Sequence, residues 1–73
     1  MNKQELLKYA EKLRDDEPCF VIRAQDKLAP KIVLNWAASA YMLGVNPDKV
    51  RNANELGARM EAWQKEHGCK VPD

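Results

Sequence analysis

Residues 30–48, PKIVLNWAASAYMLGVNPD, contain the end of one helix and the start of the next. Apolar residues recur in this stretch at helical spacing until Gly44, a residue suited to ending a helix in a left-handed conformation. Asn46 then offers an N-cap, and Pro47 fits a first helical position, where the N–H groups have no helical partner. Because the loop between these signals is tight, we predict that two helices form an antiparallel hairpin.

Both helices of this hairpin carry broad apolar stripes. The first begins near Asp26 or Pro30, with Asp26 as a suitable N-cap, and the second runs on to a stop at Gly68. The stripes predict the core, with the two tryptophans either in it or at a subunit interface. Its expected members are Ile32, Val33, Trp36, Ala37, Ala40 and Leu43 from the first helix and Val50, Ala53, Leu56, Met60 and Trp63 from the second.

A further helix is predicted N-terminal to the hairpin, from Lys3 to Arg14, with Asn2 as its N-cap. Pro18 stops it, since proline disfavours helical geometry in the residue before it. We expect this helix to pack across the hairpin. Residues 19–24 between them are rich in β-branched side chains and predict a short extended segment. This segment either pairs with its copy in another subunit or packs as a connector. The fold class is therefore mainly α, a single three-helix domain over residues 1–73.

Length and composition restrict how such a chain is stabilised. A chain of 73 residues buries a modest core and is often supplemented by a disulfide, a metal or a partner subunit. No signal peptide or membrane span is evident, so we expect a reducing cytoplasm, with Cys19 buried and inert and no disulfide between Cys19 and Cys69. One histidine and two scattered cysteines predict no metal site and no cofactor. A homo-oligomer is then the expected supplement.

The net charge and the absence of a catalytic motif argue against two classes of function, nucleic-acid binding and catalysis. The net charge of +1 lacks the basic excess of a dedicated duplex-binding protein, so a nucleic-acid partner is not expected. A nucleophile, a base and a group to orient them cannot be identified together. We therefore expect a binding protein and not an enzyme, with no catalytic residue.

The polar residues that follow the extended segment predict a ligand site. A helix N-terminus presents free N–H groups and a partial positive charge, and cationic side chains beside it favour a phosphate or carboxylate. An amide side chain can read a base edge or hydroxyl, and an exposed aromatic can stack a base. The predicted ligand-binding residues are Arg23, Gln25, Asp26, Lys27, Lys31 and Tyr41.

A simpler interpretation of the same residues stays open. In it, Asp26 only caps the helix, Arg23 pairs with a carboxylate of residues 15–17, and the lysines are solvated.

The segment EPCFVIRAQDKLAP, residues 17–30, resembles a group of small proteins encoded by bacteriophages and prophages. The likeness extends over most of the chain, including the terminal KVPD, residues 70–73. It implies a phage origin and location in the host bacterial cytoplasm. Small phage proteins of this kind are often accessory factors that counter host defence. Some inhibit a host protein, and others are oligomeric sponges that sequester nucleotide-derived immune signals. The resemblance implies no role for any single residue.

Together these observations predict a non-enzymatic phage accessory protein that sequesters a small anionic, nucleotide-derived ligand. The alternative is a protein-interaction module that inhibits a host defence protein directly, through an exposed helix face or by strand addition from residues 19–23.

Overall fold

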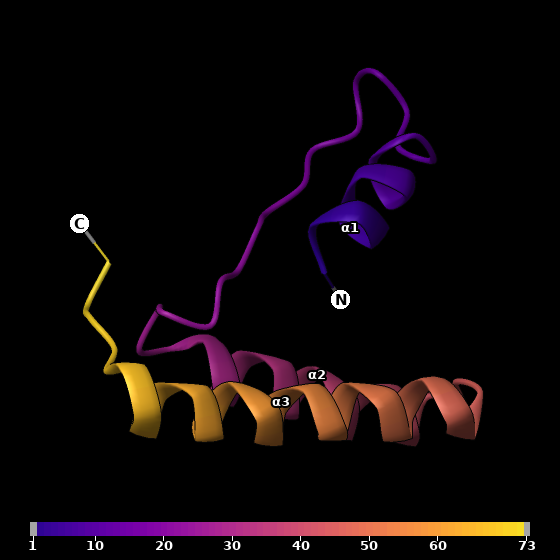
Figure 1. The fold of residues 1–73 in the computed structure, drawn as a ribbon. Coiled ribbons are helices and arrows are strands. Elements are labelled where there is room, and N and C mark those ends of the chain that lie inside the picture. The colour runs from indigo at the N-terminus through magenta and orange to yellow at the C-terminus, as the bar shows by residue number, and fades with distance from the viewer. Residues whose placement is uncertain (1, 73) are drawn as a thin grey trace.

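The chain forms three helices, α1 (Lys3–Ala10), α2 (Ala29–Met42) and α3 (Pro47–His67). The structure, a computed structural model, describes residues 2–72. Helices α2 and α3 lie side by side as an antiparallel hairpin, and α1 stands apart from them at the end of a long connector (Figure 1). The predicted mainly α fold with one extended segment is confirmed.

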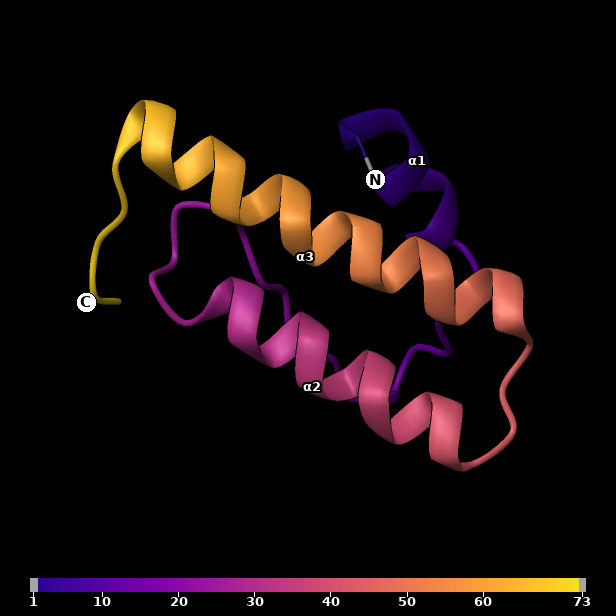
Figure 2. The same cartoon turned by 90° about the horizontal axis from the view of Figure 1, so that it is seen from below.

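The turn between α2 and α3 has the predicted chemistry. Gly44 adopts a positive φ of 76° just after α2. The Asn46 side chain accepts a 2.8 Å hydrogen bond from the Asp48 backbone N–H, and Pro47 is the first residue of α3. These local interactions reverse the chain between the helices, which Figure 2 shows running alongside each other.

The core between α2 and α3 is made of small side chains. Its buried hydrophobic members are Ala29, Ala37, Ala40, Val50 and Met60. No large side chain among residues 2–72 is fully buried. Burial of Ala37, Ala40, Val50 and Met60 was predicted, whereas the predicted core position was wrong for Ile32 and Leu43, which are exposed. Trp36 and Trp63, which were predicted for the core or a subunit interface, are exposed and lie outside the core.

A close approach of the two helices explains this core. Gly57 is buried on α3, and a β-carbon there would lie 2.6 Å from Cδ2 of Leu34 on α2. Helices that meet over a glycine and alanines leave little room between them. The bulky side chains of the stripes are therefore displaced to the flanks, where they remain in contact with solvent.

The N-terminal part of the chain, residues 2–23, is called the arm here. Its helix has the predicted Asn2 cap, with the Glu5 N–H donating to the Asn2 side chain over 2.9 Å, but it ends at Ala10 instead of Arg14. Beyond Ala10 the helix gives way to turns, closed by bonds from Lys12 N–H to the Tyr9 carbonyl and from Leu13 N–H to the Ala10 carbonyl.

The prediction that this first helix packs across the hairpin was wrong. Within the described part of the chain, no Cα atom of α1 lies within 8 Å of one in α2 or α3. The reason is the connector after Pro18, which runs extended and, at about 3.3 Å per residue, moves the helix well away from the hairpin (Figure 1).

The arm joins the hairpin at a turn held by the C-terminal tail. The Lys70 N–H donates to the Gln25 carbonyl and the Lys27 N–H to the Lys70 carbonyl, each over 2.9 Å, in an isolated parallel bridge. Residues 19–23 form no strand with any other described segment, so within one copy they act as the connector that was one of the two predicted alternatives.

Candidate ligand-binding groove

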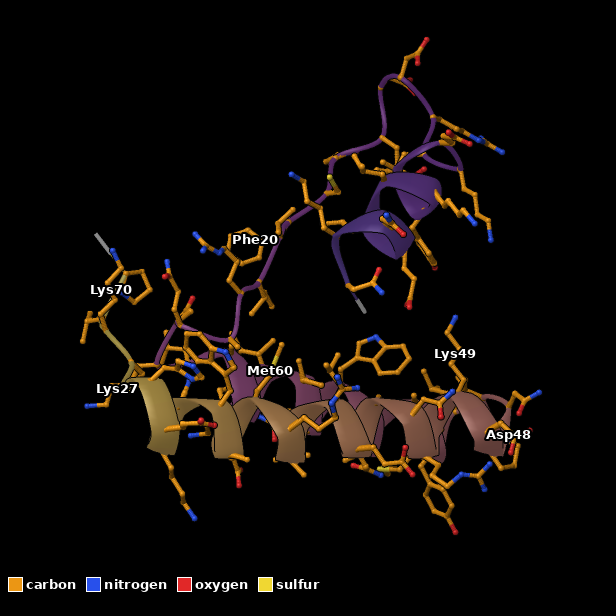
Figure 3. All side chains as sticks on the ribbon, viewed as in Figure 1. Phe20, Lys27, Asp48, Lys49, Met60 and Lys70 are labelled. Carbon is orange, nitrogen blue, oxygen red and sulfur yellow. The ribbon has the colours of Figure 1, made fainter. Side chains whose placement is uncertain are left out.

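A groove lies between the arm and the hairpin. It has a volume of about 670 Å³, which is within the usual range for small-molecule sites. The arm contributes one wall from α1 and the connector, and α3 contributes the other wall. Figure 3 shows Phe20 on the connector and Met60 on the hairpin, and both line the groove. The lining residues are Asn2, Lys3, Leu6, Phe20, Val21, Ile22, Arg23, Ala24, Leu56, Arg59, Met60 and Trp63.

The base of the groove is fixed by one side chain of α3. The Gln64 amide Nε2 donates to the backbone carbonyls of Ala24 and Asp26 over 2.9 and 2.8 Å. These two part-buried hydrogen bonds fix the chain just after the arm, where it turns toward α2. The arm thus leaves the hairpin from a defined point beside Trp63.

The charged side chains that line the groove are all cationic. Lys3, Arg23 and Arg59 reach it from α1, the connector and α3, and none of the described lining residues is an aspartate or glutamate. Two aromatic rings, those of Phe20 and Trp63, belong to the same lining. Guanidinium groups bind phosphates and carboxylates through charge-assisted hydrogen bonds, and aromatic rings stack on planar ligands. The groove therefore has the chemistry to hold an anion that carries a planar ring.

Of the residues predicted from the sequence, only Arg23 lines this groove. Gln25, Asp26 and Lys27 lie in the turn at its base, where their backbone groups pair with Lys70 and Gln64. The Asp26 carboxylate accepts a 2.8 Å bond from the Leu28 N–H, two residues along. It therefore closes a turn before the helix and is not the predicted N-cap, a position held by Leu28.

Lys31 and Tyr41 lie apart from the other predicted residues. Lys31 is exposed in the first turn of α2. Because α2 begins at Ala29, Lys27 precedes the helix, so Lys27 and Lys31 do not share a helical face. Tyr41 lies ten residues further on, about 15 Å along the axis, and lines a separate hollow of about 440 Å³ together with Arg51 and Glu55. A single small ligand does not bridge these positions and the groove.

The simpler interpretation, in which these polar residues only cap, pair and face solvent, agrees with the structure in part. The lysines are exposed as it expects, but the one ion pair among residues 2–72 joins Arg51 to Asp48. Arg23 is therefore not held by a carboxylate of residues 15–17; instead Glu17 accepts a bond from the Arg14 N–H.

Sequence reasoning missed Lys3, Phe20, Arg59 and Trp63 as site residues. Trp63 was predicted to lie in the core or at a subunit interface, and Phe20 was predicted only as part of the extended segment; in the structure Phe20 is 81% exposed. Arg59 follows Leu56 by three residues and precedes Trp63 by four, so it shares one face of α3 with them. That spacing was the available signal for a cation beside an apolar flank.

The remaining chemistry of the described residues is sparse. Cys19 and Cys69 are both free and exposed, which corrects the prediction that Cys19 is buried. No group of three metal-ligating side chains occurs in residues 2–72. Over the same range, no helix has both the length and the apolar character needed to cross a membrane.

Comparisons with protein-family models, with characterised proteins and with solved structures gave no match to this chain.

Proposed function

We propose that this chain is a non-catalytic binding protein that sequesters a small anionic ligand with a planar ring, nucleotide-derived, in the groove between the arm and α3. One observation carries the proposal: Lys3, Arg23 and Arg59 line a groove that also holds Phe20 and Trp63 and has no carboxylate in its described lining. The cations would bind phosphate groups and an aromatic ring would stack on a base. In the host cytoplasm such a protein would act as a phage counter-defence sponge.

The proposal is tested by thermal denaturation in the presence of cyclic dinucleotides and ADP-ribose. A ligand that binds only the folded state raises the melting temperature. Calorimetry on the Arg59→Ala variant should then show binding weakened by about 10-fold or more, because a hydrogen bond to a charged group is lost. Arg51→Ala is the matched control, since Arg51 is exposed on the same helix but lies outside the groove and pairs with Asp48. No shift across a broad nucleotide panel would contradict the proposal.

A second candidate function is the direct inhibition of a host protein. It is favoured by the large apolar side chains left exposed at the C-terminal end of α2, which are Tyr41, Met42 and Leu43. Exposed apolar patches mark interaction sites in soluble proteins. A host protein recovered in a one-to-one complex, with loss of its activity on binding, would support this candidate over ligand sequestration.

A further inference from the structure

The accessible surface of one copy is too large for a folded chain of this mass. It measures 6439 Å² for 8.4 kDa. The scaling of surface with mass for folded monomers gives about 4,600 Å² at this size. One copy therefore exposes about 1,800 Å² more than a folded monomer of the same mass usually does.

The surplus includes apolar surface on the side of the hairpin that faces the arm. Around α2, at about 100° per residue, Trp36 and Tyr41 lie on opposite flanks of the buried Ala37–Ala40 stripe. Tyr41 shares its hollow with Ala58 of α3, so Trp36 belongs to the other face of the hairpin. We call this other face the arm-side face. Its members are Ile32 and Trp36 on α2 and Leu56, Met60 and Trp63 on α3.

The arm does not cover this face. Ile32, Trp36 and Trp63 are 41, 47 and 39% exposed beneath it. The arm itself exposes Leu6, Leu7, Phe20 and Val21. Within the connector, residues 19–22 make no backbone hydrogen bond to any described residue. Their backbone N–H and C=O groups are therefore open to pairing with another segment. Two apolar surfaces that face one open space, and a connector without a partner, need a further element between or across them.

We infer that a second copy of this chain covers the arm and the arm-side face, as a twofold dimer in which each copy closes the open side of the other's groove. If each copy loses its surplus, the pair buries about 3,600 Å² in total, which is within the range of obligate homodimers. The short α1 could not remove the surplus by closing on its own hairpin. Its exposed large apolar residues are only Leu6, Leu7 and Tyr9, while residues 24–72 expose many more.

Sedimentation and light scattering of the full chain, from about 1 to 100 μM, test this inference. We expect twice the 8.4 kDa mass throughout. Trp36→Glu should raise the dimer dissociation constant at least 100-fold and give a monomer, because the charge would be buried without a partner. Met42→Glu is the matched control: Met42 lies on the same helix, is 84% exposed, and lies on the side of α2 away from the buried alanines, so this variant should remain a dimer.

A second measurement uses the unaltered protein, in case Trp36→Glu does not fold. In a mixture of differently isotope-labelled copies, filtered NMR spectra should show contacts from the methyl groups of Leu6 or Val21 to the Trp36 or Trp63 ring of another copy. A monomer at every concentration, or an oligomer whose inter-copy contacts avoid these residues, overturns the inference. Trp36→Glu leaves the proposed ligand-binding side chains unchanged, because Trp36 does not line the groove. A dimer that binds no nucleotide therefore contradicts only the proposed function, and a monomer that binds one contradicts only the dimer.

Discussion

The Gln64 amide on α3 donates to the Asp26 carbonyl over 2.8 Å, and the same nitrogen donates to the Ala24 carbonyl over 2.9 Å. These two bonds hold the chain on both sides of Gln25, at the point where the arm meets the hairpin. The Lys70 backbone pairs with Gln25 and Lys27 at the same point. A side chain 38 residues away in sequence from Asp26 thus decides where the groove begins.

Gln64→Ala should destabilise the protein. The substitution removes both donors and leaves the carbonyls of Ala24 and Asp26 in a half-buried turn without this partner. We expect a loss of about 1–3 kcal/mol in the free energy of unfolding, measured by urea denaturation. Lys65→Ala, an exposed neighbour on the same helix, should change it by less than about 0.5 kcal/mol. Equal effects of the two variants would show that the Gln64 bonds do not matter.

Gly68→Ala should also destabilise, through the backbone. Gly68 has φ 83° and ψ 173°, a region that is essentially restricted to glycine, and it turns the tail back toward Gln25. The strain costs about 1–3 kcal/mol. Hydrogen exchange should show faster exchange of the Lys70 amide, which donates to the Gln25 carbonyl. Unchanged protection of the Lys70 amide would show that the Gly68 turn is not what brings Lys70 to Gln25.

The control for Gly68 is the other glycine with positive φ. Gly44 has φ 76° in the turn after α2, and asparagine tolerates the left-handed region better than most residues do. Gly44→Asn should therefore cost less than Gly68→Ala in the same unfolding measurement.

The helix ends that face each other across the hairpin turn were predictable from the sequence because they depend on neighbouring residues, whereas the end of α1 and the start of α2 were not. The cap at Asn46, proline at the start of α3 and glycine after α2 all act within a few residues. The apolar period predicted the helices for the same reason. By contrast, the period cannot give the distance between two helices. Gly57 and the alanines bring them so close that Trp36 and Trp63 are left on the flank, so the predicted core was only partly right.

The site was harder to predict for a related reason. Arg23 was predicted as a cationic side chain near a helix N-terminus, and it does line the groove. Arg59 and Trp63 join it only because the arm leaves the hairpin beside Gln64, and that contact depends on the tertiary structure. Tyr41 was separated from the others by the length of α2, which could have been anticipated from its helical rise.

Asn46→Ala should weaken the hairpin turn. The Asn46 side chain satisfies the Asp48 N–H, one of the donors that have no helical partner at the start of α3. Its loss should cost about 0.5–2 kcal/mol in urea denaturation. Asn52→Ala gives the contrast, because Asn52 is exposed inside α3, where alanine is the better helix former. A cost at Asn52 equal to that at Asn46 would argue against the cap.

Gly57→Ala tests the close approach of the helices. Its effect on the free energy of unfolding should be opposite in sign when Leu34, the residue facing Gly57, is replaced by alanine. Inside a helix, alanine is favoured over glycine by about 1 kcal/mol. At Gly57, however, the added carbon would lie 2.7 Å from Leu34 Cγ, and overpacking of this kind costs about 1–3 kcal/mol. We therefore expect a net destabilisation of about 1 kcal/mol, measured by urea denaturation.

The double-mutant cycle with Leu34→Ala separates the two effects. Leu34→Ala removes the atoms that the new carbon meets, so in that background Gly57→Ala should stabilise the protein through helix propensity alone. A destabilising Gly57→Ala in both backgrounds would mean that the helices do not meet at Leu34. A stabilising effect in both would mean that they lie further apart, and the small-residue core would then not explain why the tryptophans lie outside it.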